Sequence, residues 1–258
     1  MIIVLSPAKT LDFESPLPTD KHTKPRFQRE ARELVEILRG KSETEISKLM
    51  SLSPKLTKLN VERYREFSGR PSTKNARPAL LAFRGDVYQG LQADEFDARD
   101  LNYAQDHLRI LSGLYGMLRP LDLMQPYRLE MGTSLANDAG RDLYAFWGDR
   151  ITRALNEELA NQKPKALINL ASNEYFGAVN EGLLDGRIVT PVFKDRAKGG
   201  DYRVLAFFAK RARGMMASWI IRERVDTLKG LTGFAEEGYR YSAEQSEPDR
   251  PVFLRDKG

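Results

Sequence analysis

Short, continuous apolar runs alternate along this chain with longer segments in which apolar residues recur every three or four positions. The runs are typical of buried strands. The first of them, residues 2–5, ends at Ser6-Pro7, where a loop is expected to begin. We predict strands at residues 2–5, 79–83, 108–114, 165–170, 187–193 and 202–207, with 239–241 and 252–254 closing a sheet.

The segments with helical spacing are bounded by residues that start or stop helices. Gly40 ends the first of them, Ser53 can cap a helix with its hydroxyl, and Pro54 suits a first helical position. We predict helices at residues 27–38, 43–52, 54–67, 86–91, 97–107, 142–160 and 208–224.

Strands and helices interleave without an internal repeat or a clear linker. This order predicts an α/β protein of the mixed α+β kind, in which helices surround a central mixed sheet. A length of 258 residues suits one large domain, so we expect a single domain over residues 1–258.

Composition excludes several kinds of chemistry. The chain is 41% hydrophobic and 30% charged, as in ordinary globular proteins, and it contains no cysteine. Disulfides, thiol peroxidase chemistry, cysteine-ligated clusters and thiol redox sensing are therefore excluded. The two histidines, His22 and His107, lie far apart in sequence and are better explained as surface or packing residues than as a metal site.

No apolar run approaches the roughly 18 residues of a membrane helix, and residues 1–5 are too short for a signal peptide. We therefore expect a cytoplasmic protein with neither a membrane partner nor a disulfide-linked one.

Positive charge is concentrated in one part of the chain. The formal net charge is +5, and residues 194–224 hold nine Lys or Arg against three acids, a net charge of +6. Such a run permits a nucleic-acid partner, although a solvated surface explains it equally well.

Six motifs resemble the YaaA peroxide-stress resistance family, and they span nearly the whole chain. They are SPAKTL from Ser6, FRGDVYQGL from Phe83, LRILSGLYGMLRPLDLMQPYRLEMG from Leu108, LYAFWGDRIT from Leu143, INLASNEYF from Ile168 and AKRARGMM from Ala209. The resemblance implies a bacterial cytoplasmic protein of the hydrogen-peroxide response that limits oxidative damage. It also implies a family-specific fold that binds double-stranded DNA through a positively charged cleft and a helix-hairpin-helix element.

Residues 43–67 are the best local candidate for that hairpin. Two short helices around a tight turn can direct backbone N–H groups at a phosphate, and Lys55, Lys58 and Arg63 would add charge. The turn Ser51-Leu52-Ser53-Pro54 lacks the glycine that such hairpins usually carry. A helical pair that only packs on the core explains the same apolar spacing.

Lys210, Arg211 and Arg213 form a second candidate surface on one predicted helix. No pattern of Asn, Gln and Arg directed at base edges is visible, so we expect duplex or branched DNA to be bound with weak sequence preference. Lys9 follows the first strand as a P-loop lysine does, but the glycine-rich loop is missing, and a phosphate contact is the remaining interpretation.

Two other functional classes stay open. An enzyme acting on nucleic acid or a nucleotide could use Lys9 as nucleophile or clamp, with Asp86 or Glu130 as acid or base. Iron sequestration is the weaker alternative because no Glu-x-x-His pair of the di-iron type occurs. We expect neither a metal site nor a cofactor.

Four arginines of the FRGDVYQGL motif and of the motif from Leu108 to Gly132 need partners wherever they are buried. A structural network with carboxylates and an anion site are both consistent with their positions. They are Arg84, Arg109, Arg119 and Arg128.

Overall fold

A five-stranded sheet forms the centre of the molecule, with β1 (Ile2–Leu5) in its middle. The structure is a computed structural model that describes residues 1–256, so the last two residues of the expected 1–258 domain lie outside it. The strand order is β6-β5-β1-β8-β9, in which only β6 runs antiparallel to its neighbour. The other strands are β5 (Leu108–Ser112), β6 (Gly116–Leu118), β8 (Ala166–Leu170) and β9 (Arg187–Val189).

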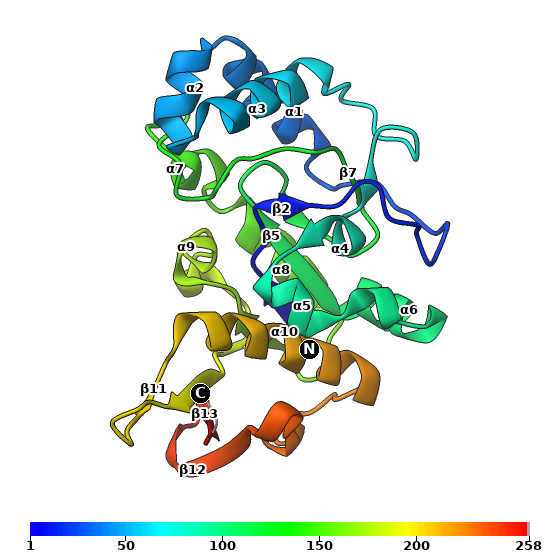
Figure 1. Ribbon diagram of the computed structural model, residues 1–258. Helices are drawn as coiled ribbons and strands as arrows, with labels where there is room; N and C mark the ends of the chain where they lie inside the picture. Colours follow the sequence, from blue (N-terminus) through cyan, green and yellow to red (C-terminus); the bar gives the residue numbers. More distant parts are fainter. Residues whose placement is uncertain (257–258) are drawn as a thin grey trace.

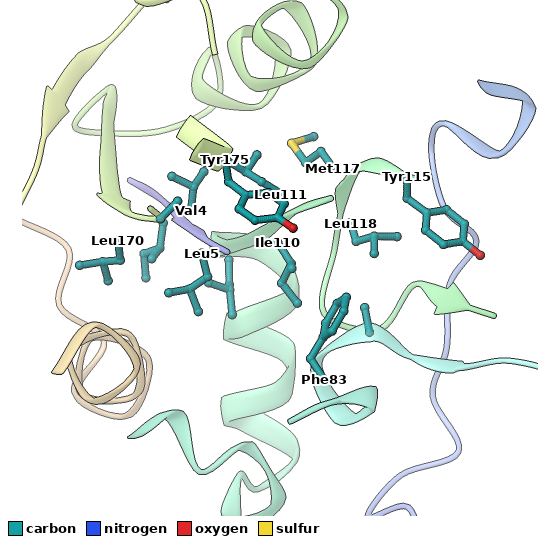
Figure 2. Close-up of a cluster of buried hydrophobic side chains, with 14 of the residues drawn as sticks. Val4, Leu5, Phe83, Ile110, Leu111, Tyr115, Met117, Leu118, Leu170 and Tyr175 are labelled. Atoms are coloured by element: carbon teal, nitrogen blue, oxygen red, sulfur yellow. The ribbon is translucent and has the colours of Figure 1, made fainter. Parts of the chain in front are cut away.

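Every residue of β1, β5 and β8 is buried, as expected of parallel strands covered on both faces. Figure 2 shows Leu5, Ile110 and Leu170, one from each strand, within a single cluster of buried side chains. The continuous apolar runs that predict these strands are therefore explained by burial on both sides.

A second sheet, of four strands, packs on the other side of α10 (Ala206–Glu223), which contacts β1 and β8 of the first sheet and β10 of the second. Figure 1 shows α10 in gold between the two sheets. Its strand order is β11 (Tyr202–Arg203), β10 (Val192–Arg196), β13 (Arg250–Arg255) and β12 (Arg240–Glu247).

Three helices form a separate layer at the top of Figure 1: α1 (Gln28–Arg39), α2 (Glu43–Met50) and α3 (Pro54–Glu66). Ser42 and Glu45 form a capping box at the start of α2. The predicted cap of α3 is confirmed, because the Ser53 hydroxyl accepts a hydrogen bond from the Leu56 N–H and Pro54 is the first helical residue.

Shorter elements connect these layers. Two antiparallel ladders pair β2 with β4 and β3 with β7. The strands are β2 (Thr10–Leu11), β3 (Arg77–Pro78), β4 (Phe83–Arg84) and β7 (Leu123–Met124). The helices are α4 (Ala79–Ala82), α5 (Asp86–Leu91), α6 (Ala98–His107), α7 (Leu143–Trp147), α8 (Arg150–Leu159) and α9 (Asn173–Phe176). Single 3₁₀ turns cover Ala93–Glu95, Glu181–Leu183, Gly230–Gly233 and Glu236–Gly238.

Within residues 1–256 the helices are all too short or too polar to cross a membrane.

Two motif glycines allow α5 and α10 to touch through their backbones. A Cβ on Gly214 would lie 1.8 Å from the Val87 carbonyl oxygen, and one on Gly90 would lie 2.1 Å from the Arg211 carbonyl oxygen. Only glycine tolerates such an approach. The FRGDVYQGL and AKRARGMM motifs are therefore two sides of one helix contact.

The expectation of a mixed α/β fold is confirmed, but four predicted elements were wrong in detail. Residues 79–83 form helix α4 and only the start of β4 rather than one strand, since a short buried apolar run suits either structure. The predicted helix 142–160 is two helices, α7 and α8, because Gly148 takes a positive φ of 46° between them.

The other two errors concern the second sheet. The predicted strand 187–193 divides between β9 and β10, which belong to different sheets and flank Thr190-Pro191. The predicted strand 202–207 is β only at β11, and α10 already begins at Ala206. The predicted closing strands at 239–241 and 252–254 fall on β12 and β13, which pair as a hairpin.

Candidate functional site

The loops after β1 and β8 meet at the carboxyl edge of the main sheet, where open α/β sheets commonly bind ligands. The Ser172 N–H donates a 2.8 Å hydrogen bond to the Ser6 hydroxyl, and the buried Tyr88 hydroxyl donates to the Ser6 carbonyl at 3.1 Å. These contacts fix the start of the loop that carries Lys9.

Lys9 meets Glu130 at this edge. Its ammonium lies 2.8 Å from Glu130 Oε2, and Arg128 Nη2 lies 3.3 Å from Glu130 Oε1. Lys9 is 62% exposed, whereas the other two side chains are mostly covered. The carboxylate therefore holds two cations together, one of them open to solvent.

Asp86 is not part of this cluster. It is the first residue of α5, and within residues 1–256 its carboxylate has neither an ion pair nor a hydrogen bond. Of the two acids expected beside Lys9, the structure brings only Glu130 to it.

A small cavity of about 80 Å³ lies beside the Lys9–Glu130 pair, and we call it the strand-edge pocket. Its polar lining residues are Lys9, Tyr127, Arg128, Glu130, Glu174 and Tyr175. Burial raises the pKa of both tyrosines well above the ordinary range, so their hydroxyls stay protonated and can donate hydrogen bonds. Arg128 Nε is buried without a partner. The pocket therefore offers hydroxyl donors from the tyrosines and a guanidinium N–H donor from Arg128 to a small polar group.

Sequence reasoning missed Glu174 and both tyrosines. Glu174 and Tyr175 lie in α9, which begins three residues after β8, and parallel strands deliver the residues after them to one edge of the sheet. That rule could have found the two from the INLASNEYF motif. Tyr127 gives no comparable signal because its place depends on the fold of an irregular loop.

The helical pair α2–α3 exists as predicted, joined by Ser51, Leu52 and Ser53. Ser51 takes the left-handed conformation, φ 51°, that usually falls to glycine at a helix end. The missing glycine therefore does not prevent a tight turn here.

On α3 the cations lack acidic partners. Lys55, Lys58 and Arg65 are exposed and Arg63 is half-buried, and none of them forms an ion pair within residues 1–256. Burial lowers the pKa of Arg63, and the neighbouring charge of Arg128 adds to this effect. The Tyr64 hydroxyl donates to the Arg128 carbonyl, which ties α3 to the strand edge.

Residues 54–77, which hold α3 and the segment after it, contain seven Lys or Arg and two Glu. Their net charge of +5 equals that of the whole chain, so the rest of the chain is neutral on balance. Tyr64 of this second basic segment hydrogen-bonds to the Arg128 carbonyl, and Arg128 shares Glu130 with Lys9.

The three cations expected on α10 differ in their surroundings. Lys210 is exposed, and Arg211 pairs with Glu237 at 2.6 Å. Arg213 is half-buried, burial lowers its pKa, and within residues 1–256 it has no hydrogen-bond or ion-pair partner. Figure 1 shows α10 well separated from α2 and α3, with β2, β5 and α5 between them. The two basic segments are therefore separate surfaces.

Each of the four motif arginines lies beside a carboxylate, an arrangement that suits a structural network. Arg84 contacts Asp12 at 3.0 Å and Asp94 at 3.2 Å. The buried Arg109 lies 2.5 Å from Glu158, Arg119 lies 3.0 Å from the buried Asp122, and Arg128 pairs with Glu130.

Potential metal ligands are scattered. Residues 1–256 contain no group of three or more His, Asp or Glu side chains placed to hold a metal ion. His107 packs against Tyr103 with ring centroids 4.1 Å apart, and its Nδ1 lies 2.9 Å from the Met1 carbonyl oxygen. His22 is exposed.

Comparison with known protein families gives a match that covers nearly the whole chain. The family model described as peroxide stress protein YaaA matches residues 1–245. The match includes the strand edge, α3 and α10.

Proposed function

The chain belongs to the peroxide stress protein YaaA family, and from this premise we propose that it binds DNA in the bacterial hydrogen-peroxide response. The ligand is duplex or distorted DNA, bound in the cytoplasm with little sequence preference, and the outcome is a limit on oxidative damage. The observation that carries the proposal is that the cations of α3 lack acidic partners, on a helix that hydrogen-bonds through Tyr64 to Arg128 at the strand edge.

Unpaired cations favour a phosphate partner. Most arginines of this protein lie beside a carboxylate, whereas Arg63 and Arg65 on α3 do not. A cation without a protein partner can exchange its counterions for phosphates, and the released counterions favour binding. The tight turn before α3 suits the proposed helix-hairpin-helix element, whose backbone N–H groups would contact the DNA backbone.

We assign α10 a secondary role. Lys210 is free to contact phosphate, Arg211 already has Glu237, and Arg213 is partly covered. Since α10 and α3 lie apart, a duplex would have to bridge them for both to bind at once.

Charge reversal tests this assignment. The double variant Lys55→Glu and Lys58→Glu should weaken duplex binding by at least about tenfold and lower the salt slope by roughly 2, one per lost phosphate contact. Lys229→Glu, an exposed lysine elsewhere, is the matched control and should leave binding unchanged. Unchanged binding in the double variant would remove α3 from the interface, and the same result for Lys210→Glu would remove α10.

A second candidate function rests on the Lys9–Glu130 contact. A lysine beside a carboxylate at the carboxyl edge of a parallel sheet can act as an electrostatic clamp or proton carrier in an enzyme acting on nucleic acid or a nucleotide. Product analysis after incubation with labelled DNA or nucleotides tests this function. Turnover that Lys9→Gln and Glu130→Gln both abolish would support an enzyme, and absence of any product would refute it.

A further inference from the structure

A long groove lies between α3 and the loops on either side of the β2 and β3 ladders, and we call it the α3 groove. Its volume of about 850 Å³ falls within the range of sites for small organic ligands, roughly 300–1,000 Å³. Its lining includes three acids, Asp12, Glu14 and Glu66, the cations Arg63, Lys74, Arg77 and Arg84, and the two leucines Leu17 and Leu59.

Arg77 brings a buried positive charge to this groove. The residue is only 5% exposed. Its Nε donates to the Leu81 carbonyl at 3.0 Å and its Nη1 to the Ser15 carbonyl at 2.6 Å, while Nη2 is buried without a partner. Both partners are neutral, so no carboxylate hydrogen-bonded to Arg77 compensates its charge, which favours an anion nearby.

Arg63 adds a second guanidinium of the same kind. Its only hydrogen-bond partner within residues 1–256 is the Asn60 side-chain oxygen, at 3.4 Å. Burial lowers the pKa of Arg63, and the nearby charge of Arg128 acts in the same direction. Two guanidinium groups without carboxylate partners therefore line one groove, and guanidinium forks match phosphate oxygens in geometry.

The acids of the groove form no hydrogen bond or ion pair with these two arginines within residues 1–256. The charge of Asp12 opposes the lowering of the Arg77 pKa by burial, but the oxygens of Asp12 are engaged elsewhere. Asp12 Oδ1 accepts the N–H groups of Glu14 and Ser15, both at 3.0 Å, and its Oδ2 pairs with Arg84. Glu14 and Glu66 are exposed, where water and salt screen their charges.

Two leucines give the groove apolar walls. Leu17 is 40% exposed and Leu59 is 38% exposed, and they come from different parts of the chain. Large exposed apolar side chains beside buried cations suit a ligand that joins a phosphate to a flat, weakly polar ring.

We propose that the α3 groove binds one unpaired nucleotide, with its phosphate on Arg63 and Arg77 and its base against Leu17 and Leu59. The nucleotide is either an unpaired unit of DNA or a free mononucleotide, since both present the same chemistry. The DNA form of the proposal rests on the proposed function, whereas the free form does not.

The test uses the full chain with two kinds of probe. Calorimetric titration compares thymidine 5′-monophosphate with thymidine and with inorganic phosphate, and anisotropy compares a duplex with the same duplex carrying one unpaired nucleotide. We expect the monophosphate to bind more tightly than either fragment, and the interrupted duplex to bind more tightly than the perfect one. Arg63→Gln should weaken the binding of the monophosphate by about tenfold, as expected for losing a charged hydrogen bond.

Arg65→Gln is the matched control. Arg65 lies on the same helix, is exposed and does not line the groove, so its loss should leave monophosphate binding unchanged. Monophosphate binding without any DNA binding would support the free-nucleotide form and refute the proposed function. DNA binding with no response to the monophosphate or to the unpaired nucleotide would overturn the inference and leave the proposed function standing. Equal effects of Arg63→Gln and Arg65→Gln on monophosphate binding would also overturn it.

Discussion

The Lys9 ammonium lies 2.8 Å from the Glu130 carboxylate, although the two residues are 121 positions apart in sequence. Glu130 also contacts Arg128, and the Arg128 carbonyl accepts a hydrogen bond from Tyr64 of α3. One acid therefore offsets two cations at the point where the strand edge meets the basic helix. Its removal should change both DNA binding and any chemistry at this edge.

We predict opposite effects for the two members of this pair. Glu130→Gln leaves Lys9 and Arg128 without their acid, so it should strengthen duplex binding, whereas Lys9→Gln should weaken it. Lys9→Gln should change the free energy of unfolding by no more than about 1 kcal/mol, because exposed ion pairs contribute little. Anisotropy and urea unfolding measure the two effects. Weaker binding in both variants would show that the ion pair itself, not the free cations, shapes the interface.

The contact between α5 and α10 predicts an effect on the stability of the fold. Gly214→Ala would place a methyl group 1.8 Å from the Val87 carbonyl oxygen, and backbone on both sides has to move. Overpacking of this kind costs about 1–3 kcal/mol or more. Gly199→Ala is the control, because a Cβ there has nothing within 4 Å. Thermal unfolding compares the two, and an equal melting temperature for both variants would contradict the contact.

His107 predicts a loss of stability at mildly acidic pH. Burial lowers the pKa of His107 in the folded protein, whereas the unfolded chain has the ordinary value near 6.5. The unfolded state therefore binds the proton more readily. The contribution of His107 is complete above about pH 6.5 and is lost as pH falls through the folded-state pKa.

Urea unfolding at pH 7.5 and pH 5 measures this effect in the native protein and in His107→Gln. The native protein should lose more stability than the variant between the two values. Equal losses would mean that His107 titrates alike in both states. His22 is present in both proteins and therefore cancels from the comparison.

The main sheet could be predicted because its strands are short apolar runs buried on both faces. The second sheet could be predicted only in outline. Strand β12 reads RYSAEQSE, mostly polar and exposed, and it forms a strand because β13 pairs with it. Residues 79–83 could not be assigned from their apolar pattern, since Ala-Leu-Leu-Ala-Phe suits a buried helix as well as a buried strand.

Some residues of the candidate site could be predicted from the sequence and others could not. Lys9 could be predicted from its place after the first strand, and the charge of α3 from composition. The partner of Lys9 could not be chosen between Asp86 and Glu130, because that choice depends on how the irregular loop after β7 folds. The buried charge of Arg77 depends on the carbonyls of Ser15 and Leu81 and leaves no trace in sequence.

Anisotropy of the native protein with a labelled duplex across a salt series tests DNA binding most directly. We predict a dissociation constant of about 10⁻⁴ to 10⁻⁶ M at physiological salt, with log affinity falling linearly as log salt rises. The slope should be about −0.9 for each phosphate contacted. Absence of binding at about 50 mM salt, or binding that salt does not weaken, would contradict a phosphate-binding surface on α3.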